Sequence, residues 1–234
     1  MKIFAAMKIL LVSATDMETA AFRNTYLSKV GSTVNGIQIN FLTTGIGMLA
    51  TAARLTSSLE QSVPDLIIQA GIAGSFSDSL ALGSVCRVAS EVIADMGVWE
   101  NGDWKDVFDL GLVDNNMPPY NNSRLGSTEP GFLDLSHIPT VNAITVNEIT
   151  TDPGRIEIYR QKYRPDIESM EGAALHFVGI ENSIPFLQLR AVSNYIGERN
   201  KANWQIKESV SNLNDSLTVL VTQLVSDKIQ INKL

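Results

Sequence analysis

The sequence predicts an α/β protein, organised as a single three-layer α/β/α domain over residues 1–234. Two observations lead to this fold class. Short, uninterrupted apolar runs alternate with longer amphipathic stretches, which is the pattern of buried strands joined by helices. Glycine-rich segments follow two of these runs, where an open α/β sheet places its ligand-binding turns. A chain of 234 residues is long enough to bury one continuous core.

Each strand and helix predicted in the first half of the chain follows from the residues of that segment. Strands are predicted where apolar residues run without interruption, because a strand covered on both faces has no polar side. Helices are predicted after a capping residue or a glycine turn. The expected elements are a strand at 8–13, a helix capped by Thr15 or Asp16, a strand at 36–43, a helix from the turn at 45–47 to Glu60, and a strand at 65–70 that ends in a glycine turn at 71–74.

The second half is predicted in the same way. Pro153 suits the first turn of a helix. The last helix has apolar residues at spacings of four and three, which gives it one apolar stripe for packing on a sheet. The expected elements are a strand at 141–146, a helix from Pro153, a strand at 167–170, a helix at 171–180, a strand at 185–192, and a long helix whose stripe is Ile206, Val210, Leu213, Leu217, Leu220 and Leu224.

Residues 97–136 are predicted to form one irregular insertion, because they are rich in Gly, Asn, Asp and Pro. They also hold several aromatic residues, which a free linker would not use. Two roles for these aromatics stay open: capping the far end of a substrate, or packing in the core. Residues 1–6 precede a second Met-Lys pair and are interpreted as an extension.

Composition excludes several classes of function. A net charge of -7 argues against nucleic acid or an anionic membrane surface as a partner, because both need a basic footprint. Cys86 is the single cysteine, and His137 and His176 are the two histidines, so neither a metal site nor any other cofactor is expected. No apolar run approaches the roughly 20 residues of a membrane-spanning helix. The cytoplasm is the expected location.

Candidate site residues follow the predicted strands, because ligands of open α/β sheets bind beyond the strands' carboxyl ends. They are carboxylates, glycine turns and an amide, with no lysine or arginine among them. The segments are 15–18, 45–47, 71–74, 147–151, 170–171 and Asn194. Each has an ordinary structural role when taken alone. Glu18 and Glu171 suit helix starts, and the glycine turns lack the spacing of a phosphate-binding loop.

Taken together, these segments resemble the purine nucleoside phosphorylase/nucleosidase superfamily. The matching segments, in chain order, are 13–18, 45–47, 69–74, 168–174 and 189–194. Residues 94–112 and 193–204 make the chain most similar to the futalosine hydrolase family, which is related to the methylthioadenosine/S-adenosylhomocysteine nucleosidases. The resemblance implies a nucleoside phosphorylase-like domain with a central mixed sheet, and a homodimer or larger homo-oligomer.

The resemblance also implies site roles. Glu18 corresponds to the carboxylate that activates water, while Met170 and Glu171 correspond to residues at the ribose. The remaining expected substrate contacts are Gly74, and Thr150 and Thr151 in the loop that contacts the base, by side chain or by backbone. Asn194 stands where adenosine-type relatives have an aspartate. An amide cannot act as a general acid, but its donor and acceptor match the 6-oxo group and N7–H of hypoxanthine.

The residue chemistry fits an N-glycosyl hydrolase. Cleavage of an N-ribosidic bond builds positive charge on the sugar, which nearby carboxylates stabilise. Phosphate would require arginine or helix N–H donors, so the expected nucleophile is water. The resemblance implies that the reaction converts futalosine to hypoxanthine and dehypoxanthine futalosine, as in menaquinone biosynthesis. The alternatives are a methylthioadenosine/S-adenosylhomocysteine nucleosidase, a phosphate-dependent purine nucleoside phosphorylase, and a non-catalytic nucleoside-binding module.

Overall fold

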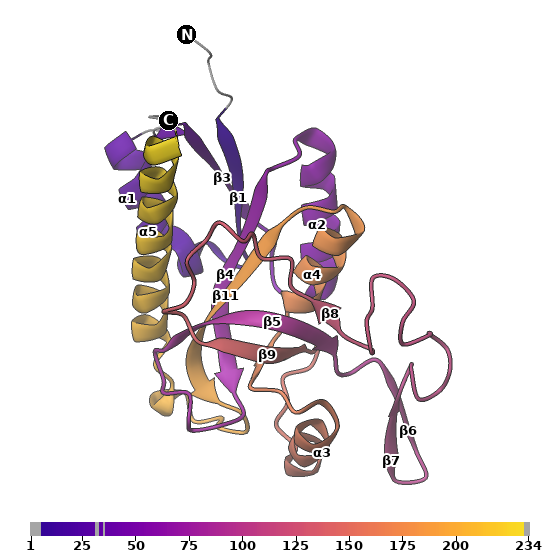
Figure 1. The fold of residues 1–234 in the computed structure, drawn as a ribbon. Helices are drawn as coiled ribbons and strands as arrows, with labels where there is room; N and C mark the ends of the chain where they lie inside the picture. The colour runs from indigo at the N-terminus through magenta and orange to yellow at the C-terminus, as the bar shows by residue number, and fades with distance from the viewer. Residues whose placement is uncertain (1–5, 31–32, 35, 232–234) are drawn as a thin grey trace.

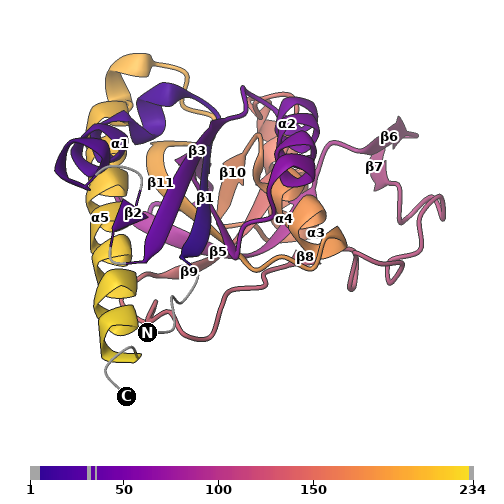
Figure 2. The same ribbon diagram turned by 90° about the horizontal axis from the view of Figure 1, so that it is seen from above.

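Three layers make up the fold, as the sequence predicts. The computed structural model describes residues 6–30, 33–34 and 36–231. A mixed sheet of nine strands lies between two pairs of helices (Figures 1 and 2). Helices α1 (Asp16–Val30) and α5 (Ile206–Ile231) cover one face, and α2 (Met48–Gln61) and α4 (Gly172–Glu181) cover the other. Helix α3 (Pro153–Tyr163) lies apart from both pairs.

The strand order is β10-β9-β5-β11-β4-β1-β3-β2, and β8 pairs with β5. The strands are β1 (Met7–Ser13), β2 (Thr33–Val34), β3 (Ile37–Thr43), β4 (Leu66–Ser75), β5 (Val85–Ile93), β8 (Leu125–Gly126), β9 (Thr140–Thr145), β10 (Ile167–Ser169) and β11 (Phe186–Tyr195). β1, β3, β4 and β11 run parallel, whereas β5 is antiparallel to β11. β10 pairs with β9 and also with the end of β4, so the sheet closes on itself there. This closure brings the residues after β10 beside the end of β4.

The segments predicted as strands and helices are found with small shifts of their ends, but the two segments after the central strands differ from expectation. Residues 71–74 are not a turn, because they continue β4 through to Ser75. Asn194 does not follow its strand, since it lies within β11 beyond a bulge between Val192 and Asn194. Strand β5 was not predicted.

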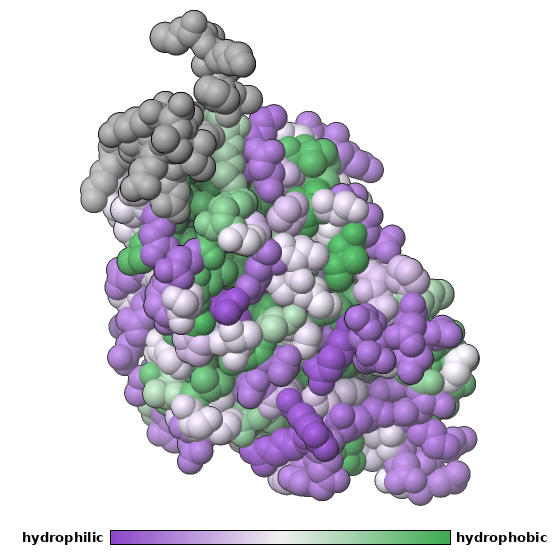
Figure 3. All heavy atoms as spheres, in the orientation of Figure 1, coloured by the Kyte–Doolittle hydropathy of each residue, from purple (hydrophilic) through white to green (hydrophobic). Residues whose placement is uncertain are grey.

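The segment 97–136 contains regular structure that its composition does not reveal. β6 (Gly97–Glu100) and β7 (Asp103–Asp106) form a hairpin, in which Trp99 and Trp104 lie opposite each other with ring centroids 5.8 Å apart. Mainly hydrophilic side chains cover this part of the surface (Figure 3). Among the described helices, none combines the length and apolar character that crossing a membrane requires.

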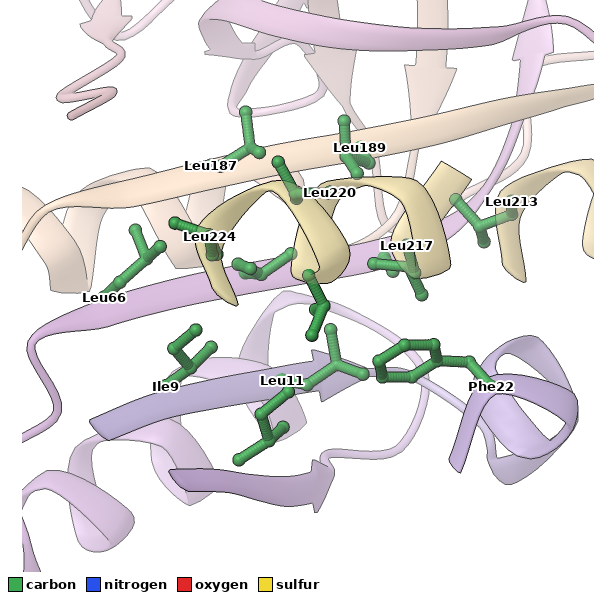
Figure 4. Packing of buried hydrophobic residues seen from close by; sticks show 14 of the residues in the cluster. Ile9, Leu11, Phe22, Leu66, Leu187, Leu189, Leu213, Leu217, Leu220 and Leu224 are labelled. Carbon is green, nitrogen blue, oxygen red and sulfur yellow. The ribbon is translucent and has the colours of Figure 1, made fainter. Parts of the chain in front are cut away.

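Four of the six residues in the predicted apolar stripe of α5 are buried on the sheet, whereas Ile206 and Val210 are only partly buried. Leu213, Leu217, Leu220 and Leu224 are buried against side chains of β1, β4 and β11 and against Phe22 of α1 (Figure 4). A helix with one apolar stripe buries it against a single surface, which here is shared by the sheet and α1. Through this packing α1 and α5 lie against each other on one face of the sheet.

Candidate functional site

A cavity of about 300 Å³ lies where β1, β4, β10 and β11 end. Five of the expected site residues line it, and they come from four separate elements or the loops after them. The lining side chains and backbone belong to Ala14, Thr15, Met17, Glu18, Ile46, Ile72, Ala73, Gly74, Ile149, Glu168, Ser169, Met170, Glu171, Ser193, Asn194, Ile196 and Trp204. The cavity is therefore mostly apolar, with carboxylates and one amide at fixed positions.

Glu18 occupies the third position of α1 and is 5% exposed. Its Oε2 accepts hydrogen bonds from the Thr15 N–H (2.8 Å) and hydroxyl (3.1 Å), which is half of a capping box. Its Oε1 accepts from the Ile72 N–H at 3.2 Å. Burial raises the pKa of Glu18, against the opposing effects of the Arg190 charge and these N–H groups. A held carboxylate with a raised pKa is suited to accept a proton.

Glu171 faces the same cavity from the start of α4 and is 6% exposed. Its Oε1 accepts from the Gly47 N–H at 3.0 Å, and its Oε2 lies 3.4 Å from Nη1 of Arg190. No lysine or arginine is expected among the residues that follow the strands, and Arg190 is not one of these residues. It lies inside β11 and reaches Glu171 from there.

Gly71 explains how Arg190 and Glu18 come together. It pairs directly with Arg190 across β4 and β11. A Cβ atom at Gly71 would lie 2.5 Å from Nη1 of Arg190 and 2.8 Å from Oε1 of Glu18. Glycine in a strand interior often marks such a close approach. The guanidinium is 1% exposed, and its Nη2 donates to Oε1 of Gln69 at 2.9 Å.

Asn194 also lines the cavity, just after the bulge in β11. Its Oδ1 accepts from the hydroxyl of Ser193 at 2.9 Å, and its Nδ2 donates to the carbonyl of Tyr195 at 3.1 Å. A Cβ atom at Gly74 would lie 2.5 Å from Cδ1 of Ile196 and 3.2 Å from this Nδ2. A bulge re-aims the side chain that follows it, here toward the cavity.

The loop after β9 contributes differently from expectation. Thr150 is buried beneath the cavity wall, where its N–H donates to Oε1 of Glu168 at 3.0 Å, and Thr151 is exposed. Neither residue lines the cavity, whereas their neighbour Ile149 does. Met170 and Gly74 both line it.

Some charged residues of the expected segments lie outside the cavity, and some residues that were not expected line it. The carboxylates of Asp16 and Glu148 are about three-quarters exposed and pair with arginines outside the cavity. Lining residues that sequence reasoning missed include Glu168, Ile196 and Trp204. Glu168 lies in the short strand β10, between Ile167 and Ser169.

Behind α4 lies another carboxylate, that of Glu91 on β5, which is fully buried. Its Oε1 accepts from Nε2 of Gln188 and its Oε2 accepts from the Thr145 hydroxyl, both at 2.9 Å. The same hydroxyl accepts from the N–H of Ala173 at 2.9 Å. Burial raises the pKa of Glu91 to about 7. This network holds the first turn of α4, directly after Glu171.

The pKa of Glu91 predicts a pH-dependent stability. The pKa of this glutamate rises from 4.5 in the unfolded chain to about 7 in the folded protein. The free energy of unfolding therefore decreases as the pH increases between these two values. Burial lowers the pKa of His176 from its usual 6.5 to about 4. This residue therefore has the opposite effect, and the free energy of unfolding increases as the pH rises between these two values. The informative quantity is therefore the difference between Glu91→Gln and wild type in the free energy of unfolding. We expect denaturant titrations to show this difference shifting in favour of the variant by about 2.5 kcal/mol from about pH 5 to about pH 8. A difference in the free energy of unfolding that does not change with pH would contradict this prediction.

A second cavity, of about 350 Å³, lies between the loop after β7 and α3. Its charged side chains already have partners within the protein. Lys162 pairs with Asp106 and Asp109, and Arg124 donates to the Ser90 hydroxyl and the Tyr163 carbonyl. Within residues 6–30, 33–34 and 36–231, no group of three or more His, Cys, Asp or Glu side chains is placed to hold a metal ion.

Several known proteins are similar to this chain over most of its length. No family model matches. A futalosine hydrolase from Streptomyces coelicolor is 28% identical, over 95% of this chain and 98% of that protein. A 5'-methylthioadenosine/S-adenosylhomocysteine nucleosidase from Anoxybacillus flavithermus is 24% identical, over 93% of this chain and 99% of that protein.

Solved structures show the same fold. A native futalosine hydrolase from Helicobacter pylori superposes with a TM-score of 0.76 at 16% identity, covering 93% of this chain and 98% of that one. A 5'-methylthioadenosine/S-adenosylhomocysteine nucleosidase from the same organism, with butyl-thio-DADMe-Immucillin-A, gives 0.76 at 17% identity, covering 93% and 99%. The nucleoside phosphorylase-like fold inferred from the sequence is thereby confirmed.

Proposed function

We propose that this chain, a member of the purine nucleoside phosphorylase/nucleosidase superfamily, hydrolyses the N-ribosidic bond of a 6-oxopurine nucleoside. Its proposed substrate is futalosine, and the products are hypoxanthine and dehypoxanthine futalosine, as in menaquinone biosynthesis. The proposed location is the cytoplasm. A methylthioadenosine/S-adenosylhomocysteine nucleosidase is the second candidate, because relatives of that name match the chain over nearly the same length.

One observation carries the hydrolase assignment: two buried carboxylates, Glu18 and Glu171, face one cavity and share a single guanidinium, that of Arg190. The balance of formal charge at these three groups is negative. An oxocarbenium-like sugar is stabilised by such a balance, because positive charge develops on the ribose as the bond breaks. Glu18 takes a proton from the attacking water, while Glu171 and Met170 contact the ribose.

Water is the proposed nucleophile even though an arginine is present. The guanidinium of Arg190 is directed to Gln69 and Glu171, and only 1% of the residue is exposed. Phosphate binding uses arginine groups that are free to form paired hydrogen bonds to the anion. Arg190 instead acts as a counter-charge that keeps two carboxylates compatible at short range.

Asn194 is proposed to recognise the base from across the cavity. An asparagine amide offers a donor and an acceptor, which match the 6-oxo group and N7–H of departing hypoxanthine. Leaving-group activation then rests on hydrogen bonding rather than on transfer of a proton from a side chain. Gly74 allows the base to approach the backbone of β4, and Thr150 and Thr151 act through the loop that carries Ile149.

A homodimer or larger homo-oligomer is part of the proposal. Met17, Ile46 and Ile149 line the cavity and yet are 56%, 64% and 45% exposed, and Leu49 on α2 is 85% exposed. Apolar side chains gathered at the rim of a binding site are typical of a surface that a partner covers. A single domain spanning residues 1–234, with 97–136 as an insertion and 1–6 as an extension, completes the proposal. Residues 1–5 lie outside the described residues.

Base release from a panel of nucleosides tests the function. Futalosine, inosine and methylthioadenosine are each incubated with the enzyme, with and without phosphate, and the free base is measured by chromatography. We expect phosphate-independent release of hypoxanthine from futalosine at the highest kcat/KM. Phosphate-dependent release would identify a phosphorylase, preferred release of adenine would identify the second candidate, and purine binding without release from any substrate would identify a binding module. Sedimentation velocity of the same sample reports the oligomeric state.

Replacing Asn194 by aspartate is expected to shift the preference toward 6-aminopurine nucleosides. A carboxyl group can carry the proton that N7 of a departing adenine needs, but it lacks the amide donor for the 6-oxo group. We expect the ratio of kcat/KM for methylthioadenosine over futalosine to rise by about 10-fold or more, since the loss of one paired polar contact costs this much. An unchanged ratio would mean that the base is recognised elsewhere.

A further inference from the structure

Asn214, on α5, bonds to the backbone of the helix that carries Glu18. Its Nδ2 donates to the carbonyl of Glu18 at 2.9 Å, and its Oδ1 accepts from the N–H of Phe22 at 2.7 Å. In an α-helix these are the two groups that one backbone hydrogen bond joins. A side chain 192 and 196 residues away in sequence therefore engages both ends of one hydrogen-bonded pair in α1.

The amide of Asn214 has a single satisfied orientation. The residue is 4% exposed, and Nδ2 also donates to the carbonyl of Val210 at 2.6 Å. Both Nδ2 hydrogens and the Oδ1 atom thus have partners within the protein. A buried amide that is fully bonded fixes the groups around it, because any rotation would leave a polar atom without a partner.

The pair held by Asn214 belongs to the residue whose carboxylate faces the cavity. The carbonyl and the Cα–Cβ bond of Glu18 move together when the first turn of α1 rotates. Asn214 restrains this carbonyl, while the Thr15 and Ile72 N–H groups restrain the carboxylate. Glu18 is therefore held at its backbone and at its side chain by separate elements.

At its N-terminal end α5 is joined to the strand that carries Asn194. The hydroxyl of Ser209 donates to the carbonyl of Val192 at 2.7 Å, and the N–H of Gln205 donates to the carbonyl of Ser193 at 2.8 Å. These two carbonyls flank the bulge of β11. Ser209 and Asn214 are separated by about 7.5 Å along the helix axis. One helix thus contacts both the strand of the base-facing amide and the helix of Glu18.

We propose that Asn214 is a positioning residue that sets the rotation of the first turn of α1, so that Glu18 is aligned relative to a base held at Asn194. This inference rests on the proposed function, in which Glu18 accepts a proton from water. Asn214 does not line the cavity and takes no part in proton transfer. Its contribution is geometric, and a displacement of about 1 Å at the reacting group lowers turnover by about 100-fold.

The test uses Asn214→Ala and Asn214→Leu in the full chain. The second variant fills the same space without a polar group, and in both variants the Glu18 carbonyl and the Phe22 N–H remain a possible backbone pair within α1. We expect kcat for base release to fall by about 10- to 100-fold, while the dissociation constant for hypoxanthine stays within about threefold. The acidic limb of the pH profile of kcat/KM, which reports the pKa of the free enzyme's base, is also expected to move.

Leu217→Ala is the matched control, because this fully buried residue lies one turn further along α5 and contacts the same apolar cluster as Phe22 (Figure 4). It lowers the melting temperature without removing a bond to α1, and we expect kcat and the pH profile to stay at wild-type values. If both Asn214 variants reduce kcat no more than Leu217→Ala does, or weaken hypoxanthine binding in parallel with kcat, the positioning role is overturned. Glu18→Gln separates the two proposals: retained turnover in that variant refutes the role of Glu18 itself, and turnover lost there but kept in both Asn214 variants refutes only this inference.

Discussion

Replacing Glu18 by glutamine is expected to lower kcat for base release by about 1,000-fold, the middle of the range for a general base. The amide has the same shape but cannot take a proton from water. Glutamine is also accepted at the third position of a capping box, so the start of α1 is expected to stay intact. Hypoxanthine binding, which the proposed function assigns to Asn194, is expected to change by less than about threefold.

Asp16→Asn is the matched control for this prediction. It removes the same charge from the same helical turn, but the side chain of Asp16 is 75% exposed and pairs with Arg23 outside the cavity. We expect its kcat to stay within about twofold of wild type, as for a surface charge. Single-turnover measurement with saturating enzyme gives the chemical step directly. Equal losses in the two variants would indicate a general effect of charge on the site, and full activity in Glu18→Gln would remove the assigned role.

The sequence predicts the part of this site that depends on topology. Glu18, Glu171 and Asn194 are found together because carboxyl ends of parallel strands meet at one edge of a sheet, and this rule requires no knowledge of side-chain packing. Glu18 and Glu171 are also ordinary helix-start residues, so their chemical role becomes visible only when the cavity is seen. The sequence pattern identifies which ends converge, but not which side chains turn inward.

Arg190 shows why the remainder was not predicted. It lies in the middle of a run of buried residues, where a charged side chain must have a partner. Gly71 lies directly opposite in the neighbouring strand, and a glycine there leaves room for the guanidinium. The buried arginine and the glycine can both be found in the sequence. They can be recognised as neighbours only when the register of β4 against β11 is known. The contacts of Asn214 are equally hidden in the sequence, because its partners in α1 are nearly 200 residues away.

Strand β5 was missed for a different reason. Its polar residues, Arg87 and Glu91, interrupt the apolar pattern expected of a buried strand. Glu91 is nevertheless fully buried, because Gln188 and Thr145 satisfy its carboxyl oxygens. A pattern based on hydropathy cannot represent a polar side chain whose partners come from other strands.

Gly172→Ala is expected to destabilise the fold and to abolish activity. A Cβ atom at Gly172 would lie 1.8 Å from Oε1 of Glu91 and 2.4 Å from Nε2 of Gln188, so it would occupy the space of their hydrogen bond. Neither partner can move away, because both are fully buried. Overpacking together with a broken bond to a buried carboxyl group is expected to cost about 3 kcal/mol or more. The displaced turn also carries Glu171, so kcat should fall further than the loss of folded protein explains.

Denaturant unfolding of Gly172→Ala is compared with Gly131→Ala, where no atom lies within 4 Å of the added Cβ and the free energy of unfolding should be nearly unchanged. A double variant gives the sharper test. Glu91→Ala vacates the space that the Cβ at Gly172 needs, so Gly172→Ala should destabilise this background far less than it destabilises wild type. The coupling between contacting sites is expected to reach about 1 to 3 kcal/mol. Additive effects would show that the close packing of Glu91 against Gly172 does not hold α4 in place, and the start of that helix would then have to be fixed from the cavity side, by the bonds of Glu171 to Gly47 and Arg190.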